Sequence, residues 1–294
     1  MSTIGLRRLA VAALSAGMAG GALAAVPATA PAAPAKRIAA LSPFSANTLA
    51  GLGVRPVGIG MTLGGADRFS ARLRGVTRLP LSHPNGPNME QLARLRPDLV
   101  LSSAAWSRGF SAMRQLGMTV RTTDPTRVTA IPAETRRLGA LVGRSAQAAT
   151  AARRQQADIA AATRGIATRP SVLLVLGVGR TPYAFLPSSW GGDVVTRAGG
   201  RLLTEGLSGS GGYAKISDEV VVAKDPDVII AVPHGNPDDL PRLADYLRAN
   251  PAWQTTTAAR TGRVFVATGN SLLQPYTDVG RTLRDVRSKY LKNG

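Results

Sequence analysis

Asp227-Val-Ile-Ile-Ala-Val-Pro-His-Gly-Asn-Pro-Asp-Asp239 places an apolar, β-branched run directly before a polar loop that carries one of the two histidines of the chain. The run does not alternate between apolar and polar residues, which is typical of a parallel strand covered on both faces. Pro233 and Gly235 end this strand, so His234 falls at its carboxyl end. Because ligands of open α/β sheets bind at the carboxyl ends of strands, His234 is a candidate binding residue.

The same pattern occurs a second time in the first half of the chain. The residues that match at one constant separation are Glu90 and Glu219, Pro97 and Pro226, Asp98 and Asp227, and Leu99 and Val228. In each copy a helical segment precedes the proline and a strand follows the aspartate, so the repeat predicts two α/β halves of similar construction. Ala105 occupies the position of His234 in the first copy, which indicates that the shared architecture does not require the histidine.

Length and charge limit the classes of protein to consider. At 294 residues, with 44% hydrophobic residues, the chain is long enough for two globular domains. A formal charge of +19 first suggests nucleic acid or an anionic membrane as partner. The arginines are spread through the chain, aromatic residues make up only 4%, and no basic run of five or more occurs. We therefore expect no nucleic-acid partner.

The first 24 residues have the composition of a secretory signal peptide. Arg7 and Arg8 precede a short Ala/Gly/Leu core, and Ala22-Leu23-Ala24 fits a cleavage site. The core is shorter than the roughly 20 apolar residues of a membrane span, which favours cleavage over anchoring. Both the general secretory and the twin-arginine export routes fit this segment. Residues 25–35 read as a Pro/Ala linker. With no cysteine for a disulfide or a lipid anchor, we expect a periplasmic or secreted monomer without a stable membrane anchor.

Strands alternating with helices predict an α/β fold of two Rossmann-like lobes with parallel sheets, joined by one long helix, with the ligand cleft between the lobes. The predicted boundaries are 36–144 for the N-terminal lobe, 145–165 for the interlobe helix and 166–294 for the C-terminal lobe. The helical pattern over 133–163 is interrupted at Gly143-Arg-Ser145, where Ser145 is the expected N-cap of the joining helix. Residues 61–80 read as a loose segment, and 216–224 as a helix.

The doubled motif supports a resemblance to a known family. Pro-Asn-Met-Glu-Gln-Leu-Ala-Arg-Leu-Arg-Pro-Asp-Leu-Val at 87–100 and Ile-Ser-Asp-Glu-Val-Val-Val-Ala-Lys-Asp-Pro-Asp-Val-Ile at 216–229 resemble the helical-backbone substrate-binding proteins of ABC importers. The resemblance covers residues 36–294. It implies a binding protein, not an enzyme, that carries iron-siderophores, haem or cobalamin to an ABC permease.

Within that family, residues 175–183, 193–200 and 232–239 look like the haem receptors of Gram-positive surface-determinant uptake systems. The resemblance implies that His234 is an axial ligand of haem iron. The second ligand in those receptors is a methionine, whose place falls in Ser82-His-Pro-Asn-Gly86, where His83 is the obvious candidate. This is a change of ligand type, and the loop also differs in length. Ferric haem accepts imidazole, and two histidines leave no open coordination position.

Further side chains are candidates for the same ligand. Tyr213, Tyr183 and Met61 could replace one of the histidines, since tyrosine also ligates haem iron. Aromatic residues that could stack on a porphyrin, or simply pack in a core, are Trp106, Phe185 and Trp190. Arginines that could pair with the propionates are Arg68, Arg72, Arg108 and Arg180.

Glu90 and Glu219 hold the doubled position at the start of the repeated helices. The resemblance implies that they dock on arginines of the permease, while the residues alone indicate only favourable charges in a first helical turn.

Two alternatives to a haem carrier remain: a ferric-siderophore or cobalamin carrier of the same class, and an enzyme on a similar scaffold, such as a metal chelatase. The enzyme reading is disfavoured because the sequence holds no cluster of carboxylates with histidine.

Overall fold

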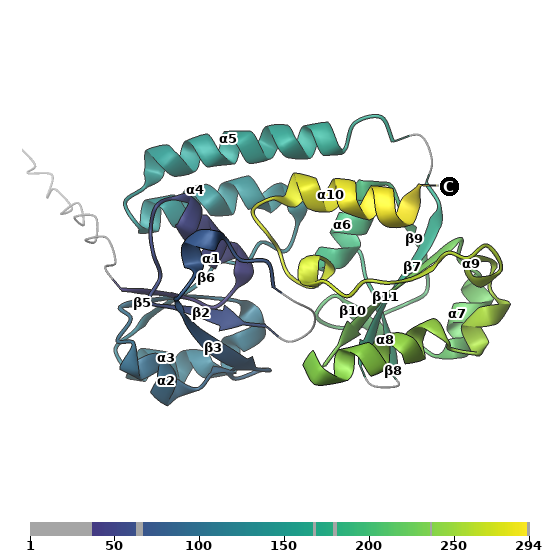
Figure 1. Ribbon diagram of the computed structural model, residues 1–294, viewed down its shortest axis with the longest axis horizontal. Helices are drawn as coiled ribbons and strands as arrows, with labels where there is room; N and C mark the ends of the chain where they lie inside the picture. Colours follow the sequence, from purple (N-terminus) through teal and green to yellow (C-terminus); the bar gives the residue numbers. More distant parts are fainter. Residues whose placement is uncertain (1–36, 63–66, 167–168, 179–180, 236, 293–294) are drawn as a thin grey trace, which may run out of the picture. The chain divides into compact units, whose positions relative to one another are not determined.

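The computed structural model describes residues 37–62, 67–166, 169–178, 181–235 and 237–292 (Figure 1). The signal-peptide and linker predictions for residues 1–35 therefore lie outside the described residues. The N-terminal sheet has the strand order β4-β3-β2-β1-β5-β6. Its strands are β1 (Ile38–Ala40), β2 (Gly58–Met61), β3 (Thr77–Ser82), β4 (Gly86–Pro87), β5 (Leu99–Ser102) and β6 (Thr119–Thr122). All neighbours are parallel except β3 and β4.

The C-terminal sheet has the order β10-β8-β7-β11-β12, and β9 pairs with β7. Its strands are β7 (Ser171–Val178), β8 (Thr181–Phe185), β9 (Arg201–Leu202), β10 (Tyr213–Lys215), β11 (Val228–His234) and β12 (Val264–Val266). The strands β7, β11, β12 and β9 are parallel, whereas β8 and β10 are antiparallel to their neighbours. The two-lobed α/β fold is confirmed, but each sheet is mixed rather than purely parallel.

The helices cover both faces of each sheet. They are α1 (Pro43–Gly51), α2 (Met89–Arg94), α3 (Phe110–Gln115), α4 (Ile131–Leu141), α5 (Ser145–Ala162), α6 (Trp190–Ala198), α7 (Asp218–Lys224), α8 (Leu240–Arg248), α9 (Thr257–Arg260) and α10 (Val279–Val286). Alternate residues of each central strand enter different cores. In β11, for example, Ile230 packs toward α6 and α10, and Ile229 packs toward α7, α8 and α9.

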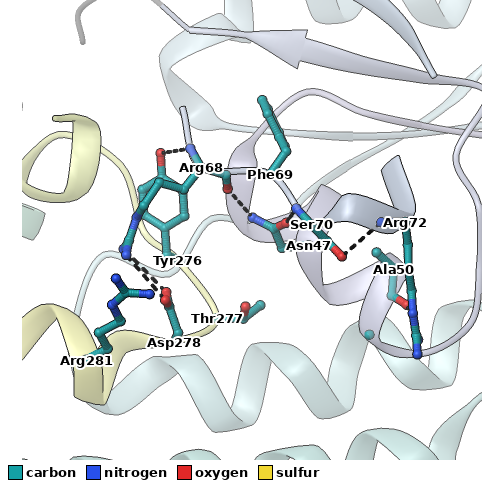
Figure 2. Close-up of a pocket in the computed structure, with 11 residues that line it drawn as sticks. Asn47, Ala50, Arg68, Phe69, Ser70, Arg72, Tyr276, Thr277, Asp278 and Arg281 are labelled. Atoms are coloured by element: carbon teal, nitrogen blue, oxygen red, sulfur yellow. Dashed lines mark hydrogen bonds and ion pairs between the residues drawn. The ribbon is translucent and has the colours of Figure 1, made fainter. Parts of the chain in front are cut away.

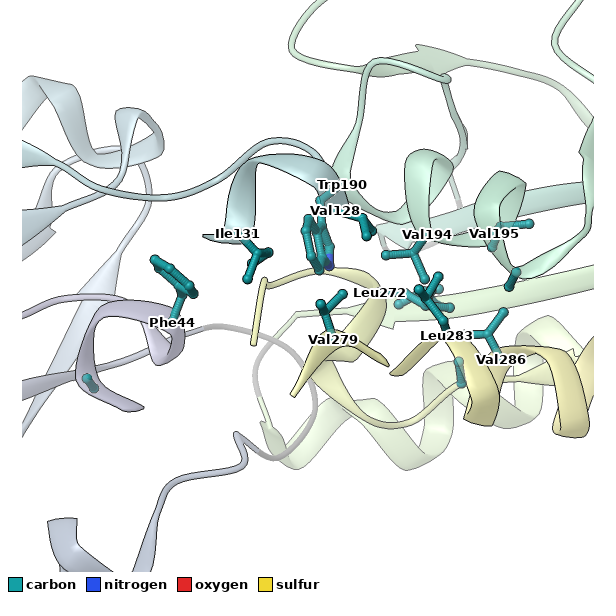
Figure 3. Close-up of a cluster of buried hydrophobic side chains, with 14 of the residues drawn as sticks. Phe44, Val128, Ile131, Trp190, Val194, Val195, Leu272, Val279, Leu283 and Val286 are labelled. Atoms are coloured by element: carbon teal, nitrogen blue, oxygen red, sulfur yellow. The ribbon is translucent and has the colours of Figure 1, made fainter. Parts of the chain in front are cut away.

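One hydrophobic cluster runs through both lobes. Phe44 of α1 and Ile131 of α4 belong to the same cluster of buried side chains as Trp190 of α6 and Val279 of α10 (Figure 3). Helix α5 packs against both α4 of the N-terminal lobe and α10 of the C-terminal lobe (Figure 1). Gly280 faces Asp158 of α5 so closely that a β-carbon would lie 2.9 Å from the aspartate backbone. The lobes are therefore joined by packed side chains as well as by the chain connection.

The repeated Pro-Asp pair has a structural role in both lobes. The carboxylate of Asp98 accepts hydrogen bonds from the backbone N–H of Arg37 at 3.2 Å, just before β1. Asp227 accepts from the backbone N–H of Ser171 at 2.7 Å, at the first residue of β7. Each aspartate thus ties the start of one central strand to the start of its neighbour. The repeat is explained by strand pairing in a shared architecture.

Three sequence-based expectations need correction. The segment predicted to be loose, 61–80, contains most of β3, in which Leu79 and Leu81 point into the core while Arg78 and Pro80 do not. The N-cap of α5 is Arg144, without a side-chain hydrogen bond, and Ser145 is the first helical residue. Helix α7 begins at Asp218 rather than at residue 216, because Ser217 is the N-cap with an extended backbone and the N–H of Ile216 bonds to the carbonyl of Pro182 beside β10.

None of the helices in the described part of the chain combines the length and the apolar character that a membrane crossing needs.

Candidate functional site

The two histidines lie at the carboxyl ends of strands in different lobes. His83 directly follows β3, and His234 is the last residue of β11, paired with Val178 of β7. Two large apolar side chains are exposed at the carboxyl ends of the neighbouring strands. Met61 is the last residue of β2 with 45% of its surface accessible, and Val178 is the last residue of β7 with 44%. Apolar side chains that surround a small number of polar groups are typical of a site for an organic ligand.

His234 is half-buried, and its surroundings favour the neutral imidazole. Burial lowers the pKa of His234 below its ordinary value, and the positive charge of His83 lowers it further. A neutral imidazole is the form that donates a lone pair to a metal ion.

Trp106 fixes the surroundings of His83. The indole and imidazole rings meet edge to face, with centroids 5.7 Å apart and an interplanar angle of 69°. Trp106 itself is 5% exposed and packs among the side chains beneath α2 and α3. Gly86, three residues after His83, has φ of 91°, a backbone conformation that favours glycine. Trp106, one of the aromatic residues that could stack on a porphyrin or pack in a core, is buried and contacts the ring of the exposed His83.

The predicted tyrosines lie on the short antiparallel strands. Tyr213 opens β10, and its ring packs against Phe185 of β8 with centroids 5.0 Å apart. Burial raises the pKa of the Tyr213 phenol, so the hydroxyl keeps its proton at neutral pH. Tyr183 is half-buried in β8. Phe185 and Trp190 are buried in the core that both lobes share, so packing accounts for both.

The predicted arginines are dispersed. Arg68 forms an ion pair with Asp278 at 3.3 Å and lies over the ring of Tyr276. Arg72 donates to the backbone carbonyl of Ala50 at 3.2 Å, and Arg108 is exposed in the 3₁₀ turn Ala104–Gly109. Arg180 lies outside the described residues.

A polar network joins the lobes beside β2, and sequence reasoning missed it. Asp67 accepts a hydrogen bond at 2.8 Å from the hydroxyl of Thr62, which follows β2. It also accepts from the side-chain amide of Asn270 at 2.7 Å and from the hydroxyl of Tyr276 at 3.3 Å, both in the C-terminal lobe. Burial, followed by the charge of Asp67, raises the pKa of Tyr276. The partners are about two hundred residues apart, and no local pattern in the sequence connects them.

A second link between the lobes centres on Asp193 in the first turn of α6. Its buried carboxylate accepts from the backbone N–H of Val128 at 2.8 Å and from the guanidinium of its helix neighbour Arg197 at 2.9 Å. Arg127 lies 3.8 Å from the same carboxylate. The connection that leaves β6 is thereby fastened to the C-terminal lobe.

Polar side chains also gather where β1, β5 and β6 end. Burial raises the pKa of Asp124 to about 6, against hydrogen bonds from Ser42 and Ser103 that lower it. Within the described residues, the side-chain oxygens of Ser102 and Thr123, and one carboxylate oxygen of Asp124, are buried without a hydrogen-bond partner. A buried carboxylate such as that of Asp124 is stabilised by taking up a proton.

Comparison with known families explains this arrangement. The model of the periplasmic binding protein family matches residues 38–270, which include both histidines and all but the last helix. The chain belongs to the periplasmic binding protein family. Its members are binding proteins, so this periplasmic binding protein is not an enzyme, and the chelatase reading is excluded.

Individual relatives share the fold across most of the chain. A cobalamin-binding protein of Halobacterium salinarum is 29% identical over 247 residues, which are 82% of this chain and 65% of the relative. The chain therefore spans slightly less than two thirds of that relative's length. An ABC transporter substrate-binding protein of Listeria monocytogenes superposes with a TM-score of 0.74 at 21% identity, covering 88% of this chain and 99% of the other. The haem complex of S. aureus IsdE gives 0.71 at 21% identity, covering 87% and 99%.

Proposed function

We propose that this periplasmic binding protein binds haem between its lobes and delivers it to the permease of an ABC importer. The observation that carries the proposal is the placement of two imidazoles at carboxyl strand ends of opposite lobes, His83 directly after β3 and His234 at the end of β11. The apolar side chains of Met61 and Val178 at the same strand ends would contact the faces or edge of a macrocycle.

The chemistry of the two imidazoles fits an iron carrier. Neutral histidine is a common axial ligand of haem iron, and ligation from both sides fills the coordination sphere. Burial of His234 holds it in the neutral form, and Trp106 restricts the ring of His83. A bound macrocycle would then be carried without an open position for oxygen chemistry. If His83 is not the second ligand, Met61 at the neighbouring strand end is the best placed substitute, ahead of Tyr183 and Tyr213.

Cobalamin is the second candidate ligand, because the halobacterial relative is named for binding it. The two ligands differ in size and in what they need from the site. Haem is flat and takes protein ligands on both faces of the iron, whereas a corrinoid that already carries axial groups offers fewer positions to histidine.

Titration of the purified protein with hemin and with cyanocobalamin separates the two. We expect hemin to give a saturable, sharpened Soret band with low-spin visible bands at one equivalent, and cyanocobalamin to give no saturable binding in the micromolar range. Binding of cyanocobalamin alone would replace the proposal with the second candidate. If hemin causes no spectral change, haem is ruled out as the ligand of this protein.

We further propose that Glu90 on α2 and Glu219 on α7 dock on basic residues of the permease. Both side chains are exposed at the start of the corresponding helices, and a hydrogen bond from Ser217 lowers the pKa of Glu219 and keeps it charged. Charge reversal of both residues, Glu90→Arg and Glu219→Arg, is expected to leave hemin affinity unchanged and to abolish uptake in cells. Normal uptake by the double variant would refute docking through these residues. The role requires export, which the predicted signal peptide at residues 1–24 would provide.

A further inference from the structure

His83 lies in the short turn of residues 83–85, which joins β3 to β4 at the edge of the N-terminal sheet. Ser82 of β3 pairs with Gly86 of β4, and the N–H of Asn85 donates to the carbonyl of Ser82 at 2.8 Å. Strand β4 is only 2 residues long, and an isolated hairpin of two strands is at best marginally stable in water. The elements that pack against this turn must therefore hold its conformation.

The 3₁₀ turn Ala104–Gly109, which follows β5, contacts the turn of residues 83–85 at Trp106. The imidazole of His83 and the indole meet in the edge-to-face arrangement that aromatic rings prefer. Trp106 is fixed, because its backbone N–H donates to the carbonyl of Ser103 at 3.0 Å and its side chain is buried in the core of the N-terminal lobe. The buried indole thus limits the orientation of an otherwise exposed imidazole.

Gly109 makes a second contact, with the backbone of the turn of residues 83–85. A β-carbon on Gly109 would overlap the carbonyl oxygen of Asn85 and lie 3.3 Å from its carbonyl carbon. Both are backbone atoms, so rotation of a side chain could not relieve the overlap. Any residue other than glycine would push the turn that carries His83 away from the 3₁₀ turn.

We propose that Trp106 and Gly109 are positioning residues for His83, which hold its turn so that the imidazole has one orientation before any ligand arrives. The inference rests on the proposed haem function for its consequence, because an axial ligand that is already oriented loses less rotamer freedom on binding. Groups that orient a metal ligand are needed for full affinity. The contact itself belongs to the ligand-free chain and is testable there.

NMR spectroscopy of the untagged, ligand-free chain tests the contact. The chain has two histidines, so the imidazole protons give two sets of signals, which His83→Gln and His234→Gln assign. We expect nuclear Overhauser effects between the ring protons of His83 and those of Trp106 in the parent chain. Trp106→Leu removes the ring current of the indole and Gly109→Ala displaces the turn, so both should shift the His83 signals and leave those of His234 in place.

Hemin titration tests the consequence for binding. Trp106→Leu and Gly109→Ala should each bind hemin about ten- to hundredfold more weakly than the parent chain, which is the usual cost of removing a group that orients a metal ligand. Trp106→Phe keeps an aromatic ring beside His83 and should recover most of the affinity.

Gly51→Ala is the matched control for Gly109→Ala. Gly51 is the last residue of α1 and borders the cavity between α1 and α10 that Figure 2 shows. A β-carbon on Gly51 would have no atom within 4 Å, so this substitution should change neither the His83 signals nor the hemin affinity.

Absence of Overhauser effects between the two rings, or His83 signals that are the same in Trp106→Leu and in the parent chain, would overturn the proposal. A hemin affinity that neither Trp106→Leu nor Gly109→Ala reduces would also overturn it. The Overhauser effects need no variant, so they decide the contact even if Gly109→Ala does not fold. If the parent chain binds no hemin, the haem proposal fails, while the Overhauser effects and the shifts of the His83 signals still decide whether these residues position the imidazole.

Discussion

Replacing Asp193 should cost far more stability than its place on a helix would suggest. Its carboxylate is 7% exposed and accepts hydrogen bonds from the backbone of Val128 at 2.8 Å and from Arg197 at 2.9 Å. Hydrogen bonds to charged groups contribute about 1.5–3 kcal/mol each, and a buried donor left without a partner costs about 1–3 kcal/mol. Arg197 is one-third exposed and can return to water, so its bond counts for less.

Together these terms predict a loss of about 3 kcal/mol for Asp193→Ala. For a chain of this size that corresponds to a fall in Tm of roughly 6–12 °C. Asp193→Asn keeps an acceptor for the Val128 N–H and should lose about half as much. Asp245→Ala is the control, because Asp245 forms a solvent-exposed ion pair with Arg248 one helical turn away, and such pairs contribute about 0–1 kcal/mol.

Urea unfolding followed by tryptophan fluorescence and circular dichroism provides the measurement, and Trp190 in the same helix reports on the lobe interface. The expected order of stability is parent chain, Asp245→Ala, Asp193→Asn and Asp193→Ala. If Asp193→Ala lies within 1 kcal/mol of Asp245→Ala, the reasoning that this carboxylate fastens the two lobes together is wrong.

Two further predictions concern pH. The pKa of Asp124 is raised to about 6 in the folded chain from an ordinary value of 3.8, so the folded form binds the proton more tightly, and the stability contributed by protonation is lost as pH rises from about 4 to 6. At pH 7.5 the free energy of unfolding of Asp124→Asn, measured with urea, should therefore exceed that of the parent chain by about 1–2 kcal/mol, after allowance for the partial exposure of Asp124. At pH 4.5 the difference should be smaller. An equal difference at both pH values would contradict this. Burial and the charge of His83 lower the pKa of His234. Hemin affinity should therefore hold constant from pH 7.5 to the ordinary histidine pKa near 6.5 and fall only below it. If the fall in hemin affinity has its midpoint at or above pH 6.5, His234 is not protected from protonation.

The alternation of elements and the doubled Pro-Asp motif were sufficient to predict two α/β lobes, because both signals are local. The register of Leu79 and Leu81 in β3 was also present in the sequence, but Pro80 between them obscured it: proline is tolerated in β3 near the sheet edge and disfavoured in a central strand. The antiparallel strands β8 and β10 were not predicted, because they are only five and three residues long and give no clear period of alternation.

In the candidate site, too, residues with a local sequence signal were predicted and residues that act through distant partners were not. His234 was predicted because it directly follows a recognisable strand, and His83 because the family resemblance indicated its loop. Asp67, Asn270 and Tyr276 were not found, since each acts through a partner in the other lobe, and such a contact leaves no periodic trace in a single sequence. Two roles stayed open for Trp106, stacking on a ligand or packing in a core, because composition does not distinguish a buried tryptophan from one that faces a cleft.

The most direct test of the proposed function is the absorption spectrum of the hemin complex with and without His234. His234→Ala should lose the low-spin visible bands and shift the Soret maximum, with hemin affinity reduced about tenfold or more. The control Asp245→Ala, which removes an exposed side chain ion-paired with Arg248, should leave the spectrum and the affinity unchanged. A hemin spectrum and affinity identical in the parent chain and in His234→Ala would contradict the claim that this histidine carries the iron.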